Sequence, residues 1–152
     1  MGIKTFINEI KKYDKLFMDT NVILYFLEGN EIFGDMSKEI FSLVKNGDVQ
    51  GYMSVISVAE LLVKPLKLND NILVDSITKF INHFPNLKIV DIDKNIALQA
   101  AQIRAKTGLK LPDALIIASA KAFGCGLIGT DTQWEQKSLG IKFLNIKKHF
   151  LA

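Results

Sequence analysis

The segment that most constrains the fold is residues 15–21, an apolar run that stops on a carboxylate. The large apolar side chains of residues 16–18 predict a short buried strand, and the apolar pattern from Val22 onward predicts a following helix. Asp19 then stands at the carboxyl end of a strand. In open α/β sheets ligands gather at that edge, because strand ends and helix amino termini face one crevice. A simpler interpretation is that Asp19 only caps the helix by accepting hydrogen bonds from its free backbone N–H groups.

The composition is typical of one globular domain spanning residues 1–152. Of the 152 residues, 49% are hydrophobic and 23% are charged, which is enough for one substantial core but not for two. No apolar run approaches the ~20 residues that a bilayer span requires, and no signal peptide pattern is present. The one cysteine, Cys125, cannot form an internal disulfide. Together these features favour a cytoplasmic protein.

Strands and helices alternate along the chain. The predicted strands cover residues 15–19, 51–55, 87–90, 126–131 and 141–146. Helices are predicted between them, with Pro65 bending or ending one, Asp93 capping another and Gly108 terminating it. A short basic tail follows the last strand. This alternation predicts an α/β fold of three α/β/α layers, with a central parallel sheet of about five strands joined by right-handed crossovers.

An extra amphipathic helix is predicted before the first strand, over residues 3–13. One face carries apolar side chains at helical spacing, namely Ile3, Phe6, Ile7, Ile10 and Tyr13. A membrane surface is a poor partner for this helix, because its polar face is short and not strongly basic. We therefore expect the apolar face to pack on the same chain or across a dimer.

Four carboxylates fall at equivalent places in this pattern. Asp19 and Asp131 end strands, and Glu60 and Asp113 lie in the first turns of helices. Each also has a structural explanation: a cap for Asp19, a capping box with Ser57 for Glu60, the helix dipole for Asp113 and a turn for Asp131. Carboxylates that share a crevice repel one another, which raises their pKa values unless a cation neutralises them. Oxygen ligands without nearby histidine favour Mg²⁺ or Mn²⁺ over zinc.

Motifs for other chemistries are absent or misplaced. Residues 124–129 spell G-x-G-x-x-G, but they stand between a helix and a strand, which is the reverse of the dinucleotide-binding context. No phosphate-binding loop and no G-x-S-x-G elbow occurs in the sequence. His83 and His149 have no partner at a metal-ligand spacing, so surface or interface roles are predicted for them.

The positive charge is modest and comes almost entirely from lysine. The net charge is +3 at pH 7, and Arg104 is the single arginine. Lysines gather in two short segments of the sequence, at residues 11–15 and 142–148. Such lysines would attract phosphates by charge rather than read bases. A solvated surface explains them equally well.

The four acidic positions, in their order and context, resemble the motifs of PIN domains. Residues 19–21 resemble the opening D-T-N, Glu60 the second acidic position, Asp113 in P-D-A the third, and Asp131 in G-T-D the fourth. Within the family, the chain is most similar to the small VapC-type toxins. These toxins are Mg²⁺-dependent ribonucleases that are paired with an antitoxin protein and are usually homodimers.

The resemblance implies a sheet with strand order 3-2-1-4-5, in which the strands that bear Asp19 and Asp131 are neighbours. It implies that Asp19, Asp113, Asp131 and Glu60 form a catalytic site around one or two Mg²⁺ or Mn²⁺ ions. An RNA substrate, an antitoxin and a second copy of the chain are then the expected partners.

Three polar residues beside the acids are predicted to orient them without adding charge: Thr20, Asn21 and Thr130. Thr130 stands where the family has Asn, which keeps a hydrogen-bonding group but removes an amide. The helix at 3–13 is a second departure, because these toxins typically begin almost at the first strand. Two alternatives therefore stay open: a PIN-like nuclease outside toxin–antitoxin systems, and a catalytically degenerate module that binds RNA or protein.

Overall fold

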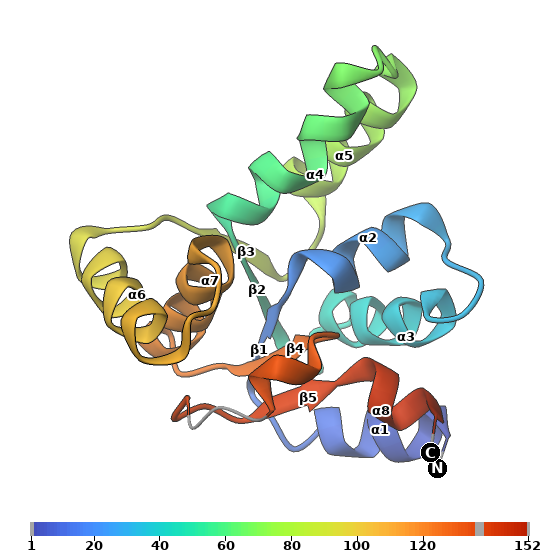
Figure 1. Cartoon of the computed structure of the whole chain (residues 1–152). Helices are drawn as coiled ribbons and strands as arrows, with labels where there is room; N and C mark the ends of the chain where they lie inside the picture. Colours follow the sequence, from blue (N-terminus) through green and yellow to red (C-terminus); the bar gives the residue numbers. More distant parts are fainter. Residues whose placement is uncertain (1, 136–138, 152) are drawn as a thin grey trace.

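The computed structural model describes residues 2–135 and 139–151, which form a parallel sheet between two layers of helices (Figure 1). The sheet has five strands in the order β3-β2-β1-β4-β5, and all four pairings are parallel. The strands are β1 (Lys15–Met18), β2 (Gln50–Ser54), β3 (Leu87–Val90), β4 (Gly126–Gly129) and β5 (Phe143–Asn145). This order confirms the predicted fold and makes β1 and β4 neighbours.

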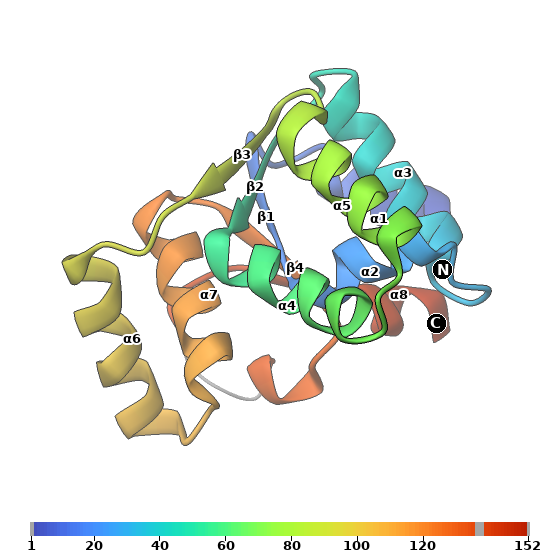
Figure 2. The ribbon, with the colours of Figure 1, turned by 90° about the horizontal axis from the view of Figure 1, so that it is seen from above.

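Helices cover both faces of the sheet (Figures 1 and 2). They are α1 (Ile3–Ile10), α2 (Thr20–Glu28), α3 (Gly34–Lys45), α4 (Val55–Lys67), α5 (Asn71–His83), α6 (Lys94–Thr107), α7 (Leu111–Ala122), the 3₁₀ turn η1 (Thr132–Trp134) and α8 (Ile146–Leu151). Helices α6 and α7 lie on one face, α1, α2, α3 and α8 lie on the other, and the α4–α5 pair projects from the molecule. Within the described residues, no helix is long and apolar enough to cross a membrane.

The apolar run of β1 is continuous because both faces of the sheet are covered. Leu16 and Met18 are buried in the core under α1, α2 and α3, whereas Phe17 is buried in the core under α7. Side chains of a strand alternate between its two faces, so a parallel strand with helices on both sides needs apolar residues at every position. The run can therefore end in a polar residue only where the strand leaves the sheet.

Helix α1 packs on the same chain, which confirms one of the two expectations for its apolar face. Phe6 and Ile10 are fully buried, and α1 contacts α3 and α8. The helix ends at Ile10 rather than at residue 13. Ile3 remains 37% exposed, so the outer end of the face is only partly covered.

The predicted capping box of α4 is wrong, and so is one of the two alternatives for Pro65, that it ends the helix. Its N-cap is Ser54, whose side chain accepts a hydrogen bond from the backbone N of Ile56 at 3.1 Å, so Ser57 lies inside the helix and forms no capping box. Pro65 does not end the helix, which continues to Lys67. Pro65 is buried and lines a groove formed with α2 and α5, and this packing outweighs the backbone hydrogen bond that its missing N–H removes.

The C-terminal region also differs from the prediction. The basic tail expected after residue 146 forms α8, whose first turn is capped by Asn145: its Oδ1 accepts a hydrogen bond from the backbone N of Lys147 at 2.9 Å. Strand β4 ends at Gly129, two residues earlier than predicted, and η1 follows it. The side chain of His149 lies outside the described part of the structure.

Candidate functional site

Two neighbouring strands lead into acidic residues at the carboxyl edge of the sheet. Asp19 directly follows β1, and Asp131 lies two residues after β4. The backbone N of Asp19 donates to the carbonyl O of Ile128 at 2.9 Å, so the β1–β4 ladder reaches the acidic position. Gly129 permits this approach, because an added Cβ would lie 3.3 Å from the Cβ of Asp19 and 3.1 Å from the Trp134 ring. The glycine therefore brings both strand ends together.

Asp19 caps α2, but the cap does not dominate its chemistry. Its Oδ1 accepts a hydrogen bond from the backbone N of Thr20 at 2.8 Å, and the residue is 6% exposed. Burial, with repulsion from Asp113 and Glu60, raises the pKa of Asp19 to about 7, although the N–H groups of Thr20 and Asn21 act in the opposite direction. A carboxylate that only capped a helix would have a lowered pKa. Both sequence interpretations therefore apply: Asp19 caps α2, and burial, assisted by the neighbouring acids, outweighs the effect of the cap on its pKa.

Asp113 links the other carboxylates electrostatically. It lies half-buried in the first turn of α7. Burial raises its pKa, repulsion from Asp131 and Glu60 adds to the rise, and Lys110 partly offsets it. Since Asp113 also acts on Asp19, the fold brings the other three predicted acidic residues within electrostatic range of Asp113.

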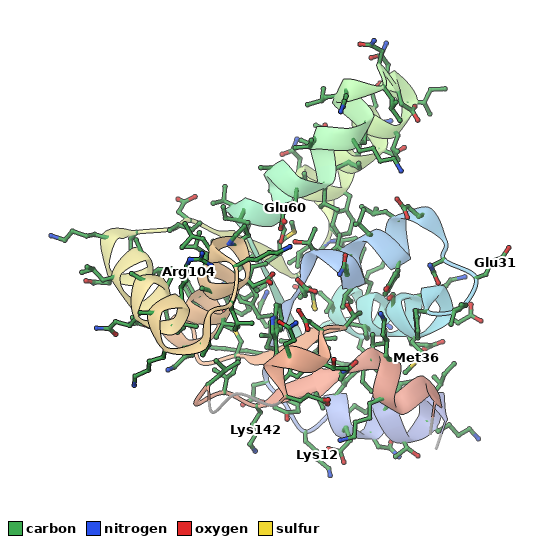
Figure 3. All side chains as sticks on the ribbon, in the orientation of Figure 1. Lys12, Glu31, Met36, Glu60, Arg104 and Lys142 are labelled. Atoms are coloured by element: carbon green, nitrogen blue, oxygen red, sulfur yellow. The ribbon has the colours of Figure 1, made fainter. Side chains whose placement is uncertain are left out.

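Glu60 is held by the Thr20 hydroxyl, which is itself hydrogen-bonded to the Ser57 hydroxyl. It extends from α4 toward α2 (Figure 3), where its Oε1 accepts a hydrogen bond from Thr20 Oγ1 at 2.7 Å. Thr20 Oγ1 also lies 2.8 Å from the Oγ of Ser57, which is fully buried. A threonine hydroxyl has one hydrogen, so while Thr20 donates to Glu60, Ser57 must donate to Thr20. The sequence did not predict this contact of Ser57, because its spacing from Glu60 also matches a capping box.

Thr130, which stands where PIN domains have Asn, takes part in a hydrogen bond at the carboxyl edge of the sheet. Thr130 is 5% exposed, and its Oγ1 accepts a hydrogen bond from Asn21 Nδ2 at 3.3 Å. The following residue, Asp131, accepts a hydrogen bond from the backbone N of Gln133 at 2.8 Å. The contacts of Thr20, Asn21 and Thr130 are therefore compatible with their predicted orienting role.

The acidic cluster is not a preformed metal cage. Within residues 2–135 and 139–151, no group of three or more His, Cys, Asp or Glu side chains is placed so that it could hold a metal ion by itself. The donors at this edge are carboxylate and hydroxyl oxygens, which suit hard cations such as Mg²⁺. Mg²⁺ usually keeps several waters and takes only one or two carboxylates, so a looser cluster suits its chemistry.

Other singled-out residues lie apart from this cluster and have structural roles. Asp93 caps α6 through a hydrogen bond from the backbone N of Ile96 at 2.8 Å. Arg104 donates to the carbonyl O of Leu109 at 2.7 Å and so braces the end of α6. Gly124 lies in the turn between α7 and β4 with a φ of +65°. The G-x-G-x-x-G segment therefore begins at the amino edge of the sheet, opposite the acidic residues.

The sequence comparison assigns a family to this arrangement. The family model described as PIN domain matches residues 16–138, a segment that contains all four carboxylates. The chain belongs to the PIN-domain family. No curated protein matches the sequence.

Several solved structures that share the fold of this PIN domain contain VapBC or FitAB proteins. A chain of VapBC2 from Rickettsia felis, bound to a promoter DNA fragment, aligns with a TM-score of 0.71 at 17% identity, covering 86% of this chain and 98% of that one. A chain of DNA-bound VapBC from Salmonella typhimurium gives 0.71 at 21% identity, with 87% and 98% covered. A chain of FitAcB from Neisseria gonorrhoeae gives 0.67 at 24% identity, with 87% and 98% covered. The residues before position 16, including α1, lie outside the family match.

Proposed function

We propose that this PIN domain is an Mg²⁺-dependent endoribonuclease that hydrolyses RNA phosphodiester bonds, and that it is the toxin of a toxin–antitoxin pair. The observation that carries the proposal is the cluster of Asp19, Glu60, Asp113 and Asp131, in which two pKa values are raised by burial and mutual repulsion. Helix caps do not require neighbouring acids, whereas a cation would neutralise the repulsion between these carboxylates and use their oxygens as ligands. The toxin assignment is supported by the shared fold with chains of VapBC and FitAB complexes.

Asp19, Asp113 and Asp131 would hold one or two Mg²⁺ or Mn²⁺ ions directly or through water, and Glu60 would complete the acidic set. The ion would supply an activated water and neutralise negative charge on the phosphate. The protein residues keep the carboxylates in place. Thr20 holds one oxygen of Glu60, and Asp19 must lose its proton before it can act as a ligand. Metal affinity should therefore rise with pH through the pKa of Asp19.

Substrate binding next to these acids requires positive charge. Lys110 is exposed, immediately precedes α7 and acts electrostatically on Asp113. Its ammonium group can therefore hold a phosphate of the RNA close to the acidic cluster, as a charge contact that carries no sequence information. Without such a contact, the carboxylates would repel the polyanionic substrate.

The purified protein should cleave single-stranded RNA when Mg²⁺ is present, and EDTA should abolish the cleavage. The carboxylates alone cannot neutralise the developing charge on the phosphate, so activity depends on the ion. Labelled RNA and DNA of the same sequence, incubated with Mg²⁺, Mn²⁺ or EDTA and separated on a denaturing gel, provide the measurement. RNA binding without metal-dependent cleavage would instead support the degenerate binding module.

Ser57→Ala should reduce the cleavage rate by about 10-fold, because the Thr20 hydroxyl loses the donor that fixes its direction toward Glu60. Ser119→Ala is the matched control: Ser119 is also fully buried in a helix, but its hydroxyl donates to the carbonyl O of Leu115. Rates per folded molecule should separate the two variants. Equal rates in both variants would show that Ser57 does not position Glu60.

The protein partners would use the projecting α4–α5 pair. Large apolar side chains are exposed there: Val63 at 63%, Leu66 at 57%, Leu68 at 64% and Ile72 at 83%. A groove of about 440 Å³ runs between α2, α4 and α5 and has Glu60 in its wall. An antitoxin and a second copy of the chain are the partners that we propose for these surfaces. Exposed apolar patches of this kind commonly mark protein interfaces.

A further inference from the structure

The amino edge of the sheet, opposite the acidic cluster, carries four exposed lysines from separate segments. Lys15 begins β1, Lys88 lies in β3, Lys121 lies near the end of α7, and Lys142 directly precedes β5. We call these four residues the edge lysines. Lys142 points away from the molecule on the side opposite α4 and Glu60 (Figure 3).

Two edge lysines share one aromatic ring. The Nζ of Lys15 lies 6.0 Å from the centroid of the Tyr52 ring, and the Nζ of Lys88 lies 5.8 Å from it. Lys15 Nζ also donates to the carbonyl O of Phe123 at 3.4 Å, and the rings of Tyr52 and Phe123 lie 5.6 Å apart. Two like charges thus lie against the same ring, and Lys15 is also fixed by a backbone carbonyl.

The other two edge lysines line a pocket of about 350 Å³. Its wall includes Tyr13, whose ring centroid lies 5.8 Å from the Nζ of Lys142, and Gly140, against which the Nζ of Lys121 lies. Cys125 also lines the pocket, but burial raises the pKa of its thiol to about 11, so it is protonated at neutral pH and not suited to nucleophilic chemistry. The pocket therefore offers two ammonium groups beside an aromatic ring.

The edge lysines lack carboxylate partners within the described part of the chain. Among the described residues, none of the four edge lysines forms an ion pair, although the exposed Asp14 adjoins Lys15 in sequence. Lys12, close by in sequence, differs because its Nζ lies 2.9 Å from Oε1 of Glu9. Clustered cations without protein anions favour binding of an external polyanion.

We propose that the edge lysines form a second RNA-binding surface, which holds phosphates of the substrate outside the bond that is cleaved. This proposal rests on the proposed ribonuclease function. The aromatic rings of Tyr13 and Phe123 favour RNA over an acidic polypeptide, because a nucleotide presents a flat base beside each phosphate. Phe123 is 36% exposed, so a base can reach its ring.

The two edges are close enough for one RNA molecule to contact both. Asp19 is the fourth residue after Lys15, so the two lie about 13 Å apart along the strand at ~3.3 Å per residue. An RNA that curves around the sheet would place one segment at the carboxylates and another on the edge lysines. The edge would then add affinity for long RNA without touching the reacting phosphate.

The test compares two variants with the same change in charge. In the edge variant, Lys15, Lys88, Lys121 and Lys142 are all replaced by Gln; in the control variant, the exposed lysines 4, 38, 67 and 79 are replaced by Gln. Fluorescence anisotropy with a labelled 30-nucleotide single-stranded RNA is measured in EDTA over a range of salt concentrations. Thermal melts of both variants verify the fold.

The edge variant should lose at least about 10-fold in affinity, and its salt slope should fall by about 0.7 for each phosphate contact removed, up to about 3. The control variant should keep the wild-type slope. Equal slopes in the two variants would overturn the proposal. So would lysine-dependent binding of poly-L-glutamate that is as tight as the binding of RNA.

A second measurement separates this surface from the catalytic site. With Mg²⁺, a short RNA that reaches only the carboxylates should be cleaved equally by the wild type and the edge variant, whereas cleavage of the 30-nucleotide RNA should slow at subsaturating concentrations. Loss of short-RNA cleavage in the edge variant would contradict a separate surface. If the wild type cleaves neither RNA but binds it through the edge lysines, the ribonuclease function fails while the RNA-binding surface stands.

Discussion

Asp113→Asn is expected to reduce Mg²⁺-dependent RNA cleavage by roughly 100-fold or more, with the fold intact. Asp113 lies among the acids, since Asp131 and Glu60 raise its pKa and it helps to raise the pKa of Asp19. Removing a group that acts directly on the reacting charge typically costs two to three orders of magnitude in rate. The amide has nearly the same shape as the carboxylate and relieves repulsion, so stability should not fall.

Asp75→Asn provides the control for this loss. Asp75 is exposed on α5, away from the carboxyl edge of the sheet, so the substitution makes the same chemical change outside the cluster. Rates of RNA cleavage at saturating Mg²⁺, with circular dichroism to verify folding, give the comparison. Full activity in purified Asp113→Asn would contradict the assignment of Asp113 to the catalytic site.

Without metal, Asp19→Asn should be more stable than the wild type at pH 8, and the difference should disappear as the pH falls toward 4. The pKa of Asp19 rises from 3.8 to about 7 in the folded chain, so the folded state holds a proton that the unfolded state releases between these values. Stability is therefore highest below the unfolded pKa and is lost as the pH rises through the folded pKa. A pKa change of one corresponds to about 1.4 kcal/mol, so the full effect is on the order of 4 kcal/mol.

The matched control is Asp93→Asn, because Asp93 caps α6 as Asp19 caps α2. Asn caps helices about as well as Asp, so both substitutions keep the cap and remove one charge. Urea unfolding at pH 4, 6 and 8 should show a pH-dependent gain for Asp19→Asn and little change for Asp93→Asn. The same response in both variants would mean that Asp19 is an ordinary cap.

The sequence carries most of the fold because its constraints are local. The apolar run of residues 16–18, the Asp93 cap and the Gly108 terminator each act within a few residues. The strand order could not be predicted in this way, because periodicity does not determine which strands pair. The resemblance to PIN domains implied the order. The order then places Asp19 beside the end of β4, as the sheet confirms.

The sequence interpretation failed where the same pattern serves two structures. Ser57 and Glu60 match a capping box, but β2 ends at Ser54, one residue earlier than predicted, so Ser54 becomes the cap and Ser57 lies inside α4, where it contacts Thr20. Only the tertiary position of α4 against α2 distinguishes these two roles. Local spacing contains no information about that contact.

Lysine clusters in the sequence were also a poor guide to the basic surface. Within the segments first singled out, Lys12 lies 2.9 Å from Oε1 of Glu9, and Lys148 lies 4.0 Å from Oε1 of Glu135. The edge lysines come instead from four distant segments that the sheet brings together, and Lys88 and Lys121 belong to neither sequence cluster. These lysines share one edge because the strand order of the sheet brings their segments together.

The most direct test of the metal site is thermal melting of the wild type and Asp19→Asn at pH 8, with and without saturating Mg²⁺. Binding to the folded state alone stabilises by about 1.4 kcal/mol at ten times Kd, which raises the Tm of a domain of this size by roughly 2–5 °C. The wild type should gain this increment. Asp19→Asn should start from a higher Tm and gain less, because repulsion and ligand are removed together. Equal Mg²⁺ shifts in the two proteins, or no shift in either, would contradict a metal site built on Asp19.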